Sequence, residues 1–463
     1  MTLLLVLLLA YSAVLIALGL WVGRLVRNTT DFFVAGRRLP AVLLFATVLA
    51  ANIGAGSTVG AAALGYQDGL SAWWWNGSAG IGSLVLATWI GPRLWRAAAD
   101  HNYLTLGDFI EARYGGAVRA VTSSLLWVAS PFILAAQLIG MSTILHVVVG
   151  APQWIGAVAG GVLILVYFVA GGLLSSAWVN LMQLAVKLIG FVIAAPVALA
   201  SIGGFGGLTA RETGAAVFDP WGPPGRGIAL ITLLVPAFIV SPGLIQKSWG
   251  AIDERAVRIG VGANGLALLI FGFLPPLIGM VARARNPHLS SADLALATVV
   301  VEALPAWIAA LTLAAILSAE LSAADAVLFM LSTSLSQDLY RRFVNRHATD
   351  AETLRVARAG AVVGGVAAMG LAVVLPTIVT ALSGFYGVLT VAFFVPVIAA
   401  VLSRRVGAPE ALTAVVTGVS IFAALQAFGH TPGGFRPEAI GLCTAAASFM
   451  IVMLVRTRPH HGP

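Results

Sequence analysis

The sequence predicts an all-α integral membrane protein with 13 transmembrane helices, and three observations support this fold class. Of the 463 residues, 59% are hydrophobic and only 10% are charged, whereas a soluble domain carries about 25% charged residues. The apolar residues also fall into long runs of about 20 residues, the length that crosses a bilayer as a helix. Finally, lysine and arginine concentrate in alternate loops between these runs, as the topology of membrane proteins requires.

The predicted spans follow one another with short loops between them. In chain order they cover residues 2–23, 41–64, 70–91, 117–148, 152–172, 175–201, 227–247, 257–282, 304–335, 354–376, 379–402, 410–429 and 437–456. The first run has no basic residues before it and is followed by Arg24 and Arg27. We therefore expect an uncleaved first span, because a signal peptide would begin with a basic region.

The basic residues predict the orientation of the chain in the membrane. Of the 26 lysines and arginines, 20 lie in loops on one side of the predicted bilayer and five on the other. Because basic loops stay in the cytoplasm, we expect a multi-pass protein of the plasma (inner) membrane with its N-terminus outside and its C-terminus inside. The net charge of +8 is assigned to these loops. Nucleic-acid binding is not expected, since there is no basic patch with interleaved aromatic residues. Residues 104–114 predict a short interfacial helix.

Two predicted spans contain backbone breaks. The span at 41–64 holds Gly54-Ala55-Gly56, and the span at 227–247 holds Ser241-Pro242-Gly243. Glycine and proline destabilise a helix interior, and unwound backbone at membrane depth is tolerated only where protein or a water-filled cavity satisfies it. A matched pair of interrupted helices indicates a transporter binding site. The alternative, that these residues only allow close packing or a kink, remains open.

Each broken span is the first of five, which predicts a 5+5 inverted repeat. We expect a single transmembrane transporter domain over residues 1–463. It would consist of an extra N-terminal span and loop at 1–40, repeats at 41–201 and 227–402, and two C-terminal spans with a tail at 410–463.

Six segments in chain order resemble the sodium:solute symporter family. They are DFFVAGRRLP (31–40), AANIGAGSTVG (50–60), LTLGDFIEARYG (104–115), GGLLSSAWVNLMQ (171–183), QKSWGAIDERAVR (246–258) and LAAILSAELSAADAVLFMLSTSLSQDLY (313–340). This family has the five-helix inverted-repeat fold first seen in the leucine transporter. The resemblance implies alternating access, Na⁺ as the coupling ion and no other cofactor.

The resemblance also implies a Na⁺ site between the spans at 41–64 and 304–335. Its ligands would be the carbonyls of Ala50, Ile53 and Ala319 and the hydroxyl of Ser322, which suits a hard cation. The sequence departs from the family at Ala323, where a second hydroxyl is usual, and at Asn180, where an aspartate is usual on the ion path. Both changes remove affinity for a cation, so H⁺ coupling or uncoupled transport remains an alternative.

Three ionisable residues lie inside predicted spans, namely Lys187, Glu320 and Asp325. Each costs roughly 2.5–3.5 kcal/mol or more at the centre of a bilayer and so needs a partner or water. We hypothesise that Lys187 and Glu320 pair, either as a fixed internal salt bridge or as a replacement for the missing sodium ligands. Asp325 matches a frequent family position, and a purely structural role for it remains open.

The family's substrate site predicts a cavity near the midplane. Its candidate residues are Ser57, Thr58, Trp75, Asn76 and Ser241. The alternative for Trp75 and the two tryptophans before it is an aromatic belt at the membrane interface, and at most one of the three can face the cavity. No charged residue stands at these positions, so a small polar solute such as an amino acid or monocarboxylate is favoured, and a sugar remains possible.

These features favour secondary active transport over other functions. The sequence has no nucleotide-binding loop and no nucleophile–base arrangement, so an enzyme or a pump is not expected. A transporter-like solute sensor and a channel remain alternatives. The expected partners are a small-molecule substrate and the lipid bilayer, with no nucleic acid and no obligate protein partner.

Overall fold

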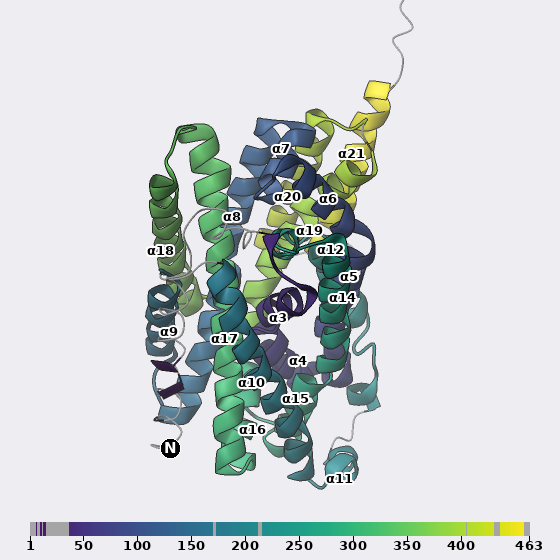
Figure 1. Cartoon of the computed structure of the whole chain (residues 1–463). Coiled ribbons are helices and arrows are strands. Elements are labelled where there is room, and N and C mark those ends of the chain that lie inside the picture. Colours follow the sequence, from purple (N-terminus) through teal and green to yellow (C-terminus); the bar gives the residue numbers. More distant parts are fainter. Residues whose placement is uncertain are drawn as a thin grey trace, which may run out of the picture.

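The computed structural model is a helical bundle (Figure 1). It describes residues 37–169, 173–211, 215–403, 405–429 and 436–457, together with Val6, Ala10, Tyr11, Ala13 and Val14. These residues contain helices and no strand beyond an isolated bridge between Leu39 and Ala251. The first predicted span, 2–23, lies largely outside the described residues.

The helices of the bundle appear in Figure 1 under the labels used here. In chain order they are α3 (Ala41–Asn52), η2 (Gly56–Gly60), α4 (Ala61–Asp68), η3 (Gly69–Ala72), α5 (Trp73–Val85), η4 (Leu86–Ile90), α6 (Gly91–His101), α7 (Leu106–Tyr114), α8 (Gly116–Val149), α9 (Gln153–Val169), α10 (Leu173–Ala200), α11 (Gly204–Arg211), η5 (Ala215–Phe218), α12 (Arg226–Ile239), α13 (Pro242–Trp249), α14 (Glu254–Phe271), α15 (Leu274–Arg285), η6 (Ala292–Leu294), α16 (Ala295–Ala303), α17 (Ala306–Thr333), η7 (Ser334–Val344), α18 (Asp350–Val374), α19 (Ile378–Leu402), α20 (Ala408–Phe428) and α21 (Pro437–Thr457).

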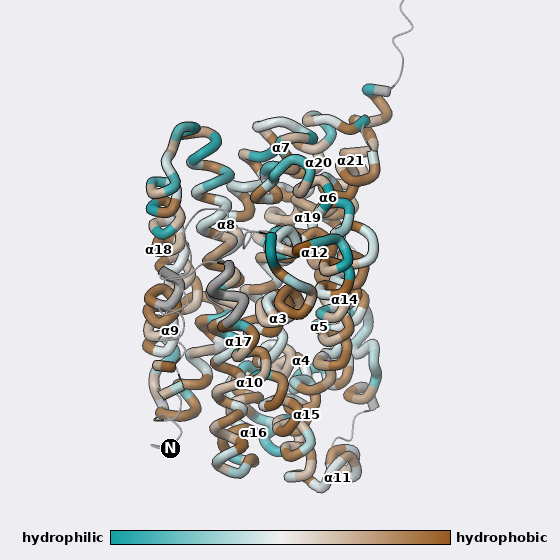
Figure 2. The backbone as a smooth tube through the Cα atoms, in the orientation of Figure 1, coloured by the Kyte–Doolittle hydropathy of each residue, from teal (hydrophilic) through white to brown (hydrophobic). Residues whose placement is uncertain are grey.

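Much of this bundle is apolar enough to cross a membrane. Within the described ranges, nine helices have the required length and composition, or ten if the bent pair that begins with α3 counts as one span. Figure 2 shows the pattern expected of a membrane protein, with brown apolar helices through the middle and hydrophilic segments gathered near α7 and beyond α18. Helices lie at each predicted range from 41–64 onward, but the count of 13 spans and the inverted repeat stay predictions.

The first predicted break is present and lies beside α3. This helix ends at Asn52, and the chain resumes as a helix at Gly56 after a bend of 64°. Gly54 faces the side chains of Ala323 and Gln137, and a Cβ added to it would lie only 2.5 Å from the Ala323 Cβ. The break therefore both interrupts the helix and brings its backbone close to α17 and α8.

The second predicted break separates α12 from α13. α12 ends at Ile239, and α13 begins at Pro242. Proline is tolerated at the first position of a helix because its missing N–H would have no partner there. Ser241 has a non-helical conformation at this point, with φ −54° and ψ 115°, so the helix is interrupted there, although residues Arg226–Trp249 together still form one membrane-length span.

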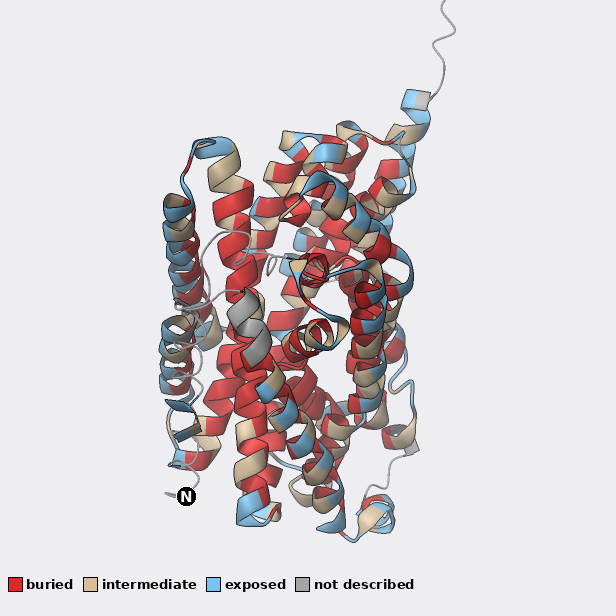
Figure 3. Cartoon of the chain, viewed as in Figure 1, coloured by how far each residue is buried: buried red, intermediate tan, exposed pale blue. Residues whose placement is uncertain are grey.

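Burial increases toward the centre of the bundle. In the most apolar 18-residue window of the α17 span, 89% of the residues are buried, against 22% for the window in α21. Figure 3 shows the same contrast, with α17 largely red and α9 and α18 carrying exposed faces. The interrupted helix α3 packs against α10, α14 and α17. The centre therefore holds the first break and the most polar part of α17.

Close helix packing next to this break depends on Gly65 in α4. A Cβ at this position would lie 2.3 Å from the carbonyl oxygen of Pro276 in α15, whereas a Cβ at Gly370 in α18 meets nothing within 4 Å. We expect Gly65→Ala to destabilise the protein by about 1–3 kcal/mol through overpacking. Gly370→Ala, the matched control, should be neutral or stabilising by up to about 1 kcal/mol. Thermal unfolding in detergent measures both, and equal midpoints for the two variants would contradict the tight packing.

Candidate functional site

The first helix break frees two backbone carbonyls for use by side chains. In an unbroken helix the carbonyls of Ala50 and Ile53 would accept hydrogen bonds from the amides of Gly54 and Ser57. The Ser57 amide instead donates to the carbonyl of Gly54 at 3.0 Å. Because backbone at membrane depth must find partners within the protein, these carbonyls are available as acceptors.

Polar side chains from neighbouring helices bond the rest of the break. Gln137 of α8 accepts a hydrogen bond from the Ala55 amide at 2.8 Å. Asn76 of α5 donates to the Ser57 carbonyl at 3.1 Å, and the Ser57 hydroxyl donates to the carbonyl of Asn52 at 2.6 Å. The unwound segment is therefore held in place by side chains that converge on it from two other helices.

The residues predicted as cation ligands come together at this break. The Ser322 hydroxyl of α17 lies 2.8 Å from the Ala50 carbonyl oxygen and 3.2 Å from the Ala319 carbonyl oxygen. Ala323 lies against Gly54 of the break but offers only a methyl group, so the second hydroxyl is absent, as the sequence indicates. The site thus has one oxygen fewer than the family pattern implies.

The Lys187 side chain of α10 extends into this group of oxygens. Its Nζ donates to the Ala50 carbonyl at 2.8 Å, to the Ile53 carbonyl at 3.2 Å and to the Ser322 hydroxyl at 2.6 Å. The side chain is fully buried. A Na⁺ bound to the same three oxygens would have to take the position of the ammonium nitrogen, so the residues as arranged do not fit Na⁺ at this place.

Glu320 lies near Lys187 without bonding to it directly. Its carboxylate accepts a hydrogen bond from Thr58 Oγ1 at 3.4 Å and lies against Gly140 of α8, where an added Cβ would be 2.7 Å from Oε1. Across the described residues, no ion pair joins Lys187 and Glu320 within 4.0 Å, although each side chain lies in the electric field of the other. The hypothesised ion pair is therefore wrong as a direct contact, because the ammonium bonds the backbone oxygens of the break instead.

A second buried lysine was not expected from the sequence. Lys247, the last residue of the predicted span at 227–247, lies within α13 with 2% of its surface exposed. Its Nζ donates to the Thr47 carbonyl at 2.9 Å, and Asn180 donates to Thr47 Oγ1 at 3.3 Å. The buried carboxylate of Asp325 acts on Lys247 electrostatically. The sequence did hold a signal, since Lys247 follows the second break by only a few residues.

A small polar cavity lies directly beside the break, and its free space of about 20 Å³ holds little more than one water molecule. Three of the predicted substrate residues, Ser57, Trp75 and Asn76, line it. Thr58 and Ser241 do not, because the Thr58 hydroxyl turns to the Gly54 carbonyl and to Glu320, while Ser241 sits at the second break. The remaining lining residues are Ala51, Asn52, Gly54, Gly56, Ala79, Ile133, Gln137, Leu234, Phe238, Ala323, Leu382 and Tyr386.

The cavity wall is neutral, and sequence reasoning missed part of it. None of the residues that line it is charged. Asn52 and Gln137 were identifiable as rare polar residues within apolar runs, whereas nothing in the sequence singles out Phe238 or Tyr386. Ala323 and Gly54 line the cavity, whereas the neighbouring Ser322 bonds Lys187. Adjacent residues of α17 therefore contact the cavity and the ammonium.

The three consecutive tryptophans have different surroundings. Trp75 is buried and lines the cavity, with its ring edge-on to that of Tyr386. Trp73 donates to the Leu269 carbonyl at 3.0 Å, and Trp74 stacks on Trp221. Only Trp75 of the three therefore belongs to the cavity.

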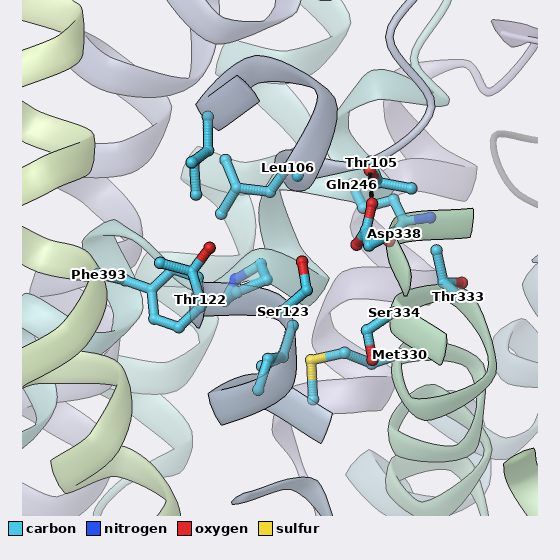
Figure 4. A pocket seen from close by; sticks show the side chains of 14 residues that line it. Thr105, Leu106, Thr122, Ser123, Gln246, Met330, Thr333, Ser334, Asp338 and Phe393 are labelled. Carbon is cyan, nitrogen blue, oxygen red and sulfur yellow. Dashed lines mark hydrogen bonds between the residues drawn. The ribbon is translucent and has the colours of Figure 1, made fainter. Parts of the chain in front are cut away.

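A second pocket, lined by apolar and hydroxyl side chains, lies under α7, toward the end of the bundle where α7 caps it (Figures 1 and 4). Figure 4 shows Thr122 and Ser123 of α8 opposite Met330 and Ser334, with Phe393 closing one side and Asp338 bonded to Thr105 on the other. Pro242 and Gln246 of α13 also line this pocket. It therefore lies between the second break and the α7 end of the bundle.

Ionic contacts close this end of the bundle, and their centre is Arg119 of α8. The guanidinium lies 2.8 Å from carboxylate oxygens of Asp108, Glu111 and Asp338, which belong to α7 and η7. A hydrogen bond from Arg342 and further contacts with Arg119 hold the pKa of Glu111 below its ordinary value, although partial burial opposes this. One arginine thus joins three segments of the chain.

Comparison with protein families and curated proteins gives a consistent result. A model described as the sodium:solute symporter family matches residues 32–418. A sodium/pantothenate symporter of Escherichia coli (strain K12) is 28% identical over 96% of this chain and 95% of its own length. A sodium/proline symporter of the same organism is 22% identical over 77% of this chain and 74% of its own length.

Solved structures show the same fold. A Na⁺-coupled sialic acid symporter in a substrate-bound outward-open state superimposes with a TM-score of 0.81 and 18% identity, covering 98% of both chains. A nucleobase-cation-symport-1 family transporter in a closed conformation gives a TM-score of 0.60 at 14% identity, covering 93% of this chain and 95% of its own.

Proposed function

Because this chain belongs to the sodium:solute symporter family, we propose that it carries a small polar organic solute across the membrane by secondary active transport. Family membership supports solute symport as the activity and Na⁺ as the coupling ion. The protein spans the membrane several times and binds a small molecule, with no covalent chemistry assigned to any residue.

The observation that carries this proposal is the neutral polar cavity beside the first helix break. Discontinuous helices place freed backbone groups and helix ends next to the substrate in transporters. Here the cavity is lined by residues of the break itself and by residues of α5, α8, α12, α17 and α19. A solute bound there touches helices on several sides of the bundle, so its binding can favour one arrangement of the helices over another.

The cavity chemistry narrows the class of solute. Asn52, Asn76, Gln137 and Ser57 offer amide and hydroxyl groups, and Trp75 offers an aromatic face. Such a wall can hydrogen-bond a small polar solute, such as an amino acid or a monocarboxylate. Pantothenate, which the first relative is named for, carries one carboxylate, one amide and two hydroxyls and is a first candidate for a conformation in which the helices around the cavity move apart, since the cavity of about 20 Å³ is too small for it here.

The arrangement in the membrane follows from the basic loops. We propose that the α7 end of the bundle faces the cytoplasm of the plasma (inner) membrane, with the N-terminus outside and the C-terminus inside. The helical segments at this end of the bundle, α6, α7, η7 and the start of α18, contain Arg93, Arg113, Arg341, Arg355 and Arg358, which fits the rule that basic segments remain on the cytoplasmic side. We further propose a single transporter domain of 13 spans with two inverted repeats, at 41–201 and 227–402.

Uptake into proteoliposomes tests the proposed function. The purified chain would be reconstituted and supplied with radiolabelled pantothenate, proline and glucose, with an inward Na⁺ gradient or with choline in place of Na⁺. We expect accumulation of one solute class above its equilibrium level only under the Na⁺ gradient. Solute binding without any net flux would identify a sensor, and flux that no ion gradient drives uphill would identify a channel; either result overturns the proposal.

Trp75 is expected to contribute to solute affinity. Its ring forms part of the cavity wall, so Trp75→Ala should raise the apparent KM of uptake at least about tenfold by removing a large contact surface. The matched control is Trp74→Ala, because Trp74 packs on Trp221 outside the cavity. Initial rates of uptake measure both variants, and an equal rise in KM for the two would contradict the assigned cavity.

A further inference from the structure

The predicted Na⁺ site already contains a positive charge that belongs to the protein. Lys187 Nζ lies 2.6–3.2 Å from the Ala50 carbonyl, the Ile53 carbonyl and the Ser322 hydroxyl. A lysine ammonium has three N–H donors and no acceptor. All three donors therefore have an acceptor here, and the fully buried ammonium needs no water or further ligand.

Electrostatic attraction offsets part of the cost of burying the ammonium. It lies at the C-terminal end of α3, where the helix dipole and freed carbonyls attract a cation. The charged side chains that act on it are Glu320 of α17, which attracts it, and Lys247 of α13, which repels it. Protein oxygens accept the hydrogen bonds of the ammonium, so no water molecule is needed to satisfy it.

Two departures from the family pattern agree with a cation supplied by the protein. Ala323 stands where a second hydroxyl would complete the coordination of Na⁺, and Asn180 stands where a carboxylate would attract an entering ion. Na⁺ prefers more oxygen ligands than an ammonium can use. A site that holds Lys187 can therefore lose one hydroxyl ligand and still satisfy the charge of the ammonium. The sequence changes and the lysine geometry are separate observations that lead to the same conclusion.

We propose that the Lys187 ammonium permanently takes the place of Na⁺ at the oxygens of Ala50, Ile53 and Ser322. This inference rests on the proposed function, since it concerns the cation site of a symporter of this family. In this chain the oxygens that the family resemblance assigns to Na⁺ bond a charge that is tethered to the protein.

The first experiment restores a free cation site. The double variant Lys187→Ala, Ala323→Ser removes the ammonium and supplies the missing hydroxyl. We expect its unfolding midpoint to rise saturably with NaCl and not with choline chloride, because a ligand that binds only the folded state stabilises it. The rise should be absent in Lys187→Ala, Ser322→Ala, which lacks one of the oxygens. A folded double variant with no Na⁺-specific rise overturns the proposal.

The second experiment uses the unaltered lysine, so it remains informative if the double variant does not fold. Binding of ²²Na⁺ would be measured for the wild-type chain and for Ser322→Ala. We expect Ser322→Ala to leave the Na⁺ affinity within about twofold of wild type, a difference of less than about 0.5 kcal/mol. Absence of measurable Na⁺ binding in both proteins would also agree with the proposal, because no Na⁺ would then bind at Ser322. Loss of a wild-type Na⁺ site in Ser322→Ala would show that Na⁺ binds there despite Lys187 and would overturn the proposal.

These outcomes are independent of the uptake assay. Uptake driven by a Na⁺ gradient with ²²Na⁺ binding unaffected by Ser322→Ala supports both the proposed function and the tethered charge. Absence of Na⁺-driven uptake overturns the proposed coupling alone, and a Ser322-dependent Na⁺ site overturns the tethered charge alone.

Discussion

Replacing Arg119 with methionine is expected to destabilise the folded protein by about 3–5 kcal/mol, since it leaves the buried carboxylate of Asp338 and the partly buried carboxylates of Asp108 and Glu111 without their cation. Arg119 lies 2.8 Å from carboxylate oxygens of Asp108, Glu111 and Asp338, and 7% of its side chain is exposed. Methionine keeps most of the volume of the side chain, so the expected effect comes from the charge and its hydrogen bonds. The free energy of unfolding, measured by denaturant titration in detergent micelles, checks this expectation.

The matched control for this prediction is Arg258→Met. Arg258 also contacts a carboxylate, Glu254, at 2.8 Å, but 48% of its side chain is exposed. Exposed pairs of this kind contribute about 0.3–0.5 kcal/mol. The role assigned to burial at Arg119 would be wrong if the two variants lost similar stability. Because Arg119 closes the α7 end of the bundle, Arg119→Met should also change the rate of uptake, whereas Arg258→Met should not.

Replacing Lys187 with methionine is expected to lower stability by about 3–5 kcal/mol as well, through loss of a buried cation and its acceptors. The change leaves the carbonyls of Ala50 and Ile53 without their hydrogen bonds and leaves Glu320 without the nearest opposite charge. The rate of uptake should fall at least about tenfold, equivalent to a rise of at least about 1.4 kcal/mol in the activation free energy of transport, because the break borders the solute cavity.

A double-mutant cycle separates the two charges. Glu320→Gln removes the carboxylate that the lost ammonium would leave unbalanced. We therefore expect Lys187→Met with Glu320→Gln to be more stable than the sum of the single effects predicts, by about 1–3 kcal/mol. Combining Lys187→Met with Glu254→Gln, whose carboxylate bonds surface arginines, should be additive. Additivity in both cycles would show that Lys187 and Glu320 do not act on each other.

The sequence predicted the helical framework well because its signals are local. Apolar runs, Gly54-Ala55-Gly56 and Ser241-Pro242-Gly243 each act through the conformation of their own backbone, and the structure places both breaks at these residues. The short helix predicted at 104–114 is present as Leu106–Tyr114. At its start, the Thr105 side chain accepts a hydrogen bond from the Asp108 amide, and the Asp108 side chain accepts one from the Thr105 amide. These two residues lie three positions apart, so this cap, too, is a local signal of the sequence.

The buried charges show where sequence reasoning was insufficient. Lys187 and Glu320 were both identified as costly in a bilayer, and pairing them was the simplest way to offset that cost. The structure instead gives Lys187 three oxygens of the broken helix. A sequence shows which residues need partners, but several acceptors compete for one ammonium, and only the packing of α10 against α3 and α17 decides among them.

By itself the sequence determined that this chain crosses the membrane, where its first and second helix breaks lie, and to which family its motifs belong. Composition, periodicity and local backbone preference are enough for these conclusions. Only the tertiary structure decided that Trp75 and not Trp74 lines the cavity, that Lys247 is buried, and that an ammonium lies where a sodium ion was predicted. These facts depend on distances between residues more than 100 positions apart, and such distances follow from how whole helices pack rather than from any local pattern.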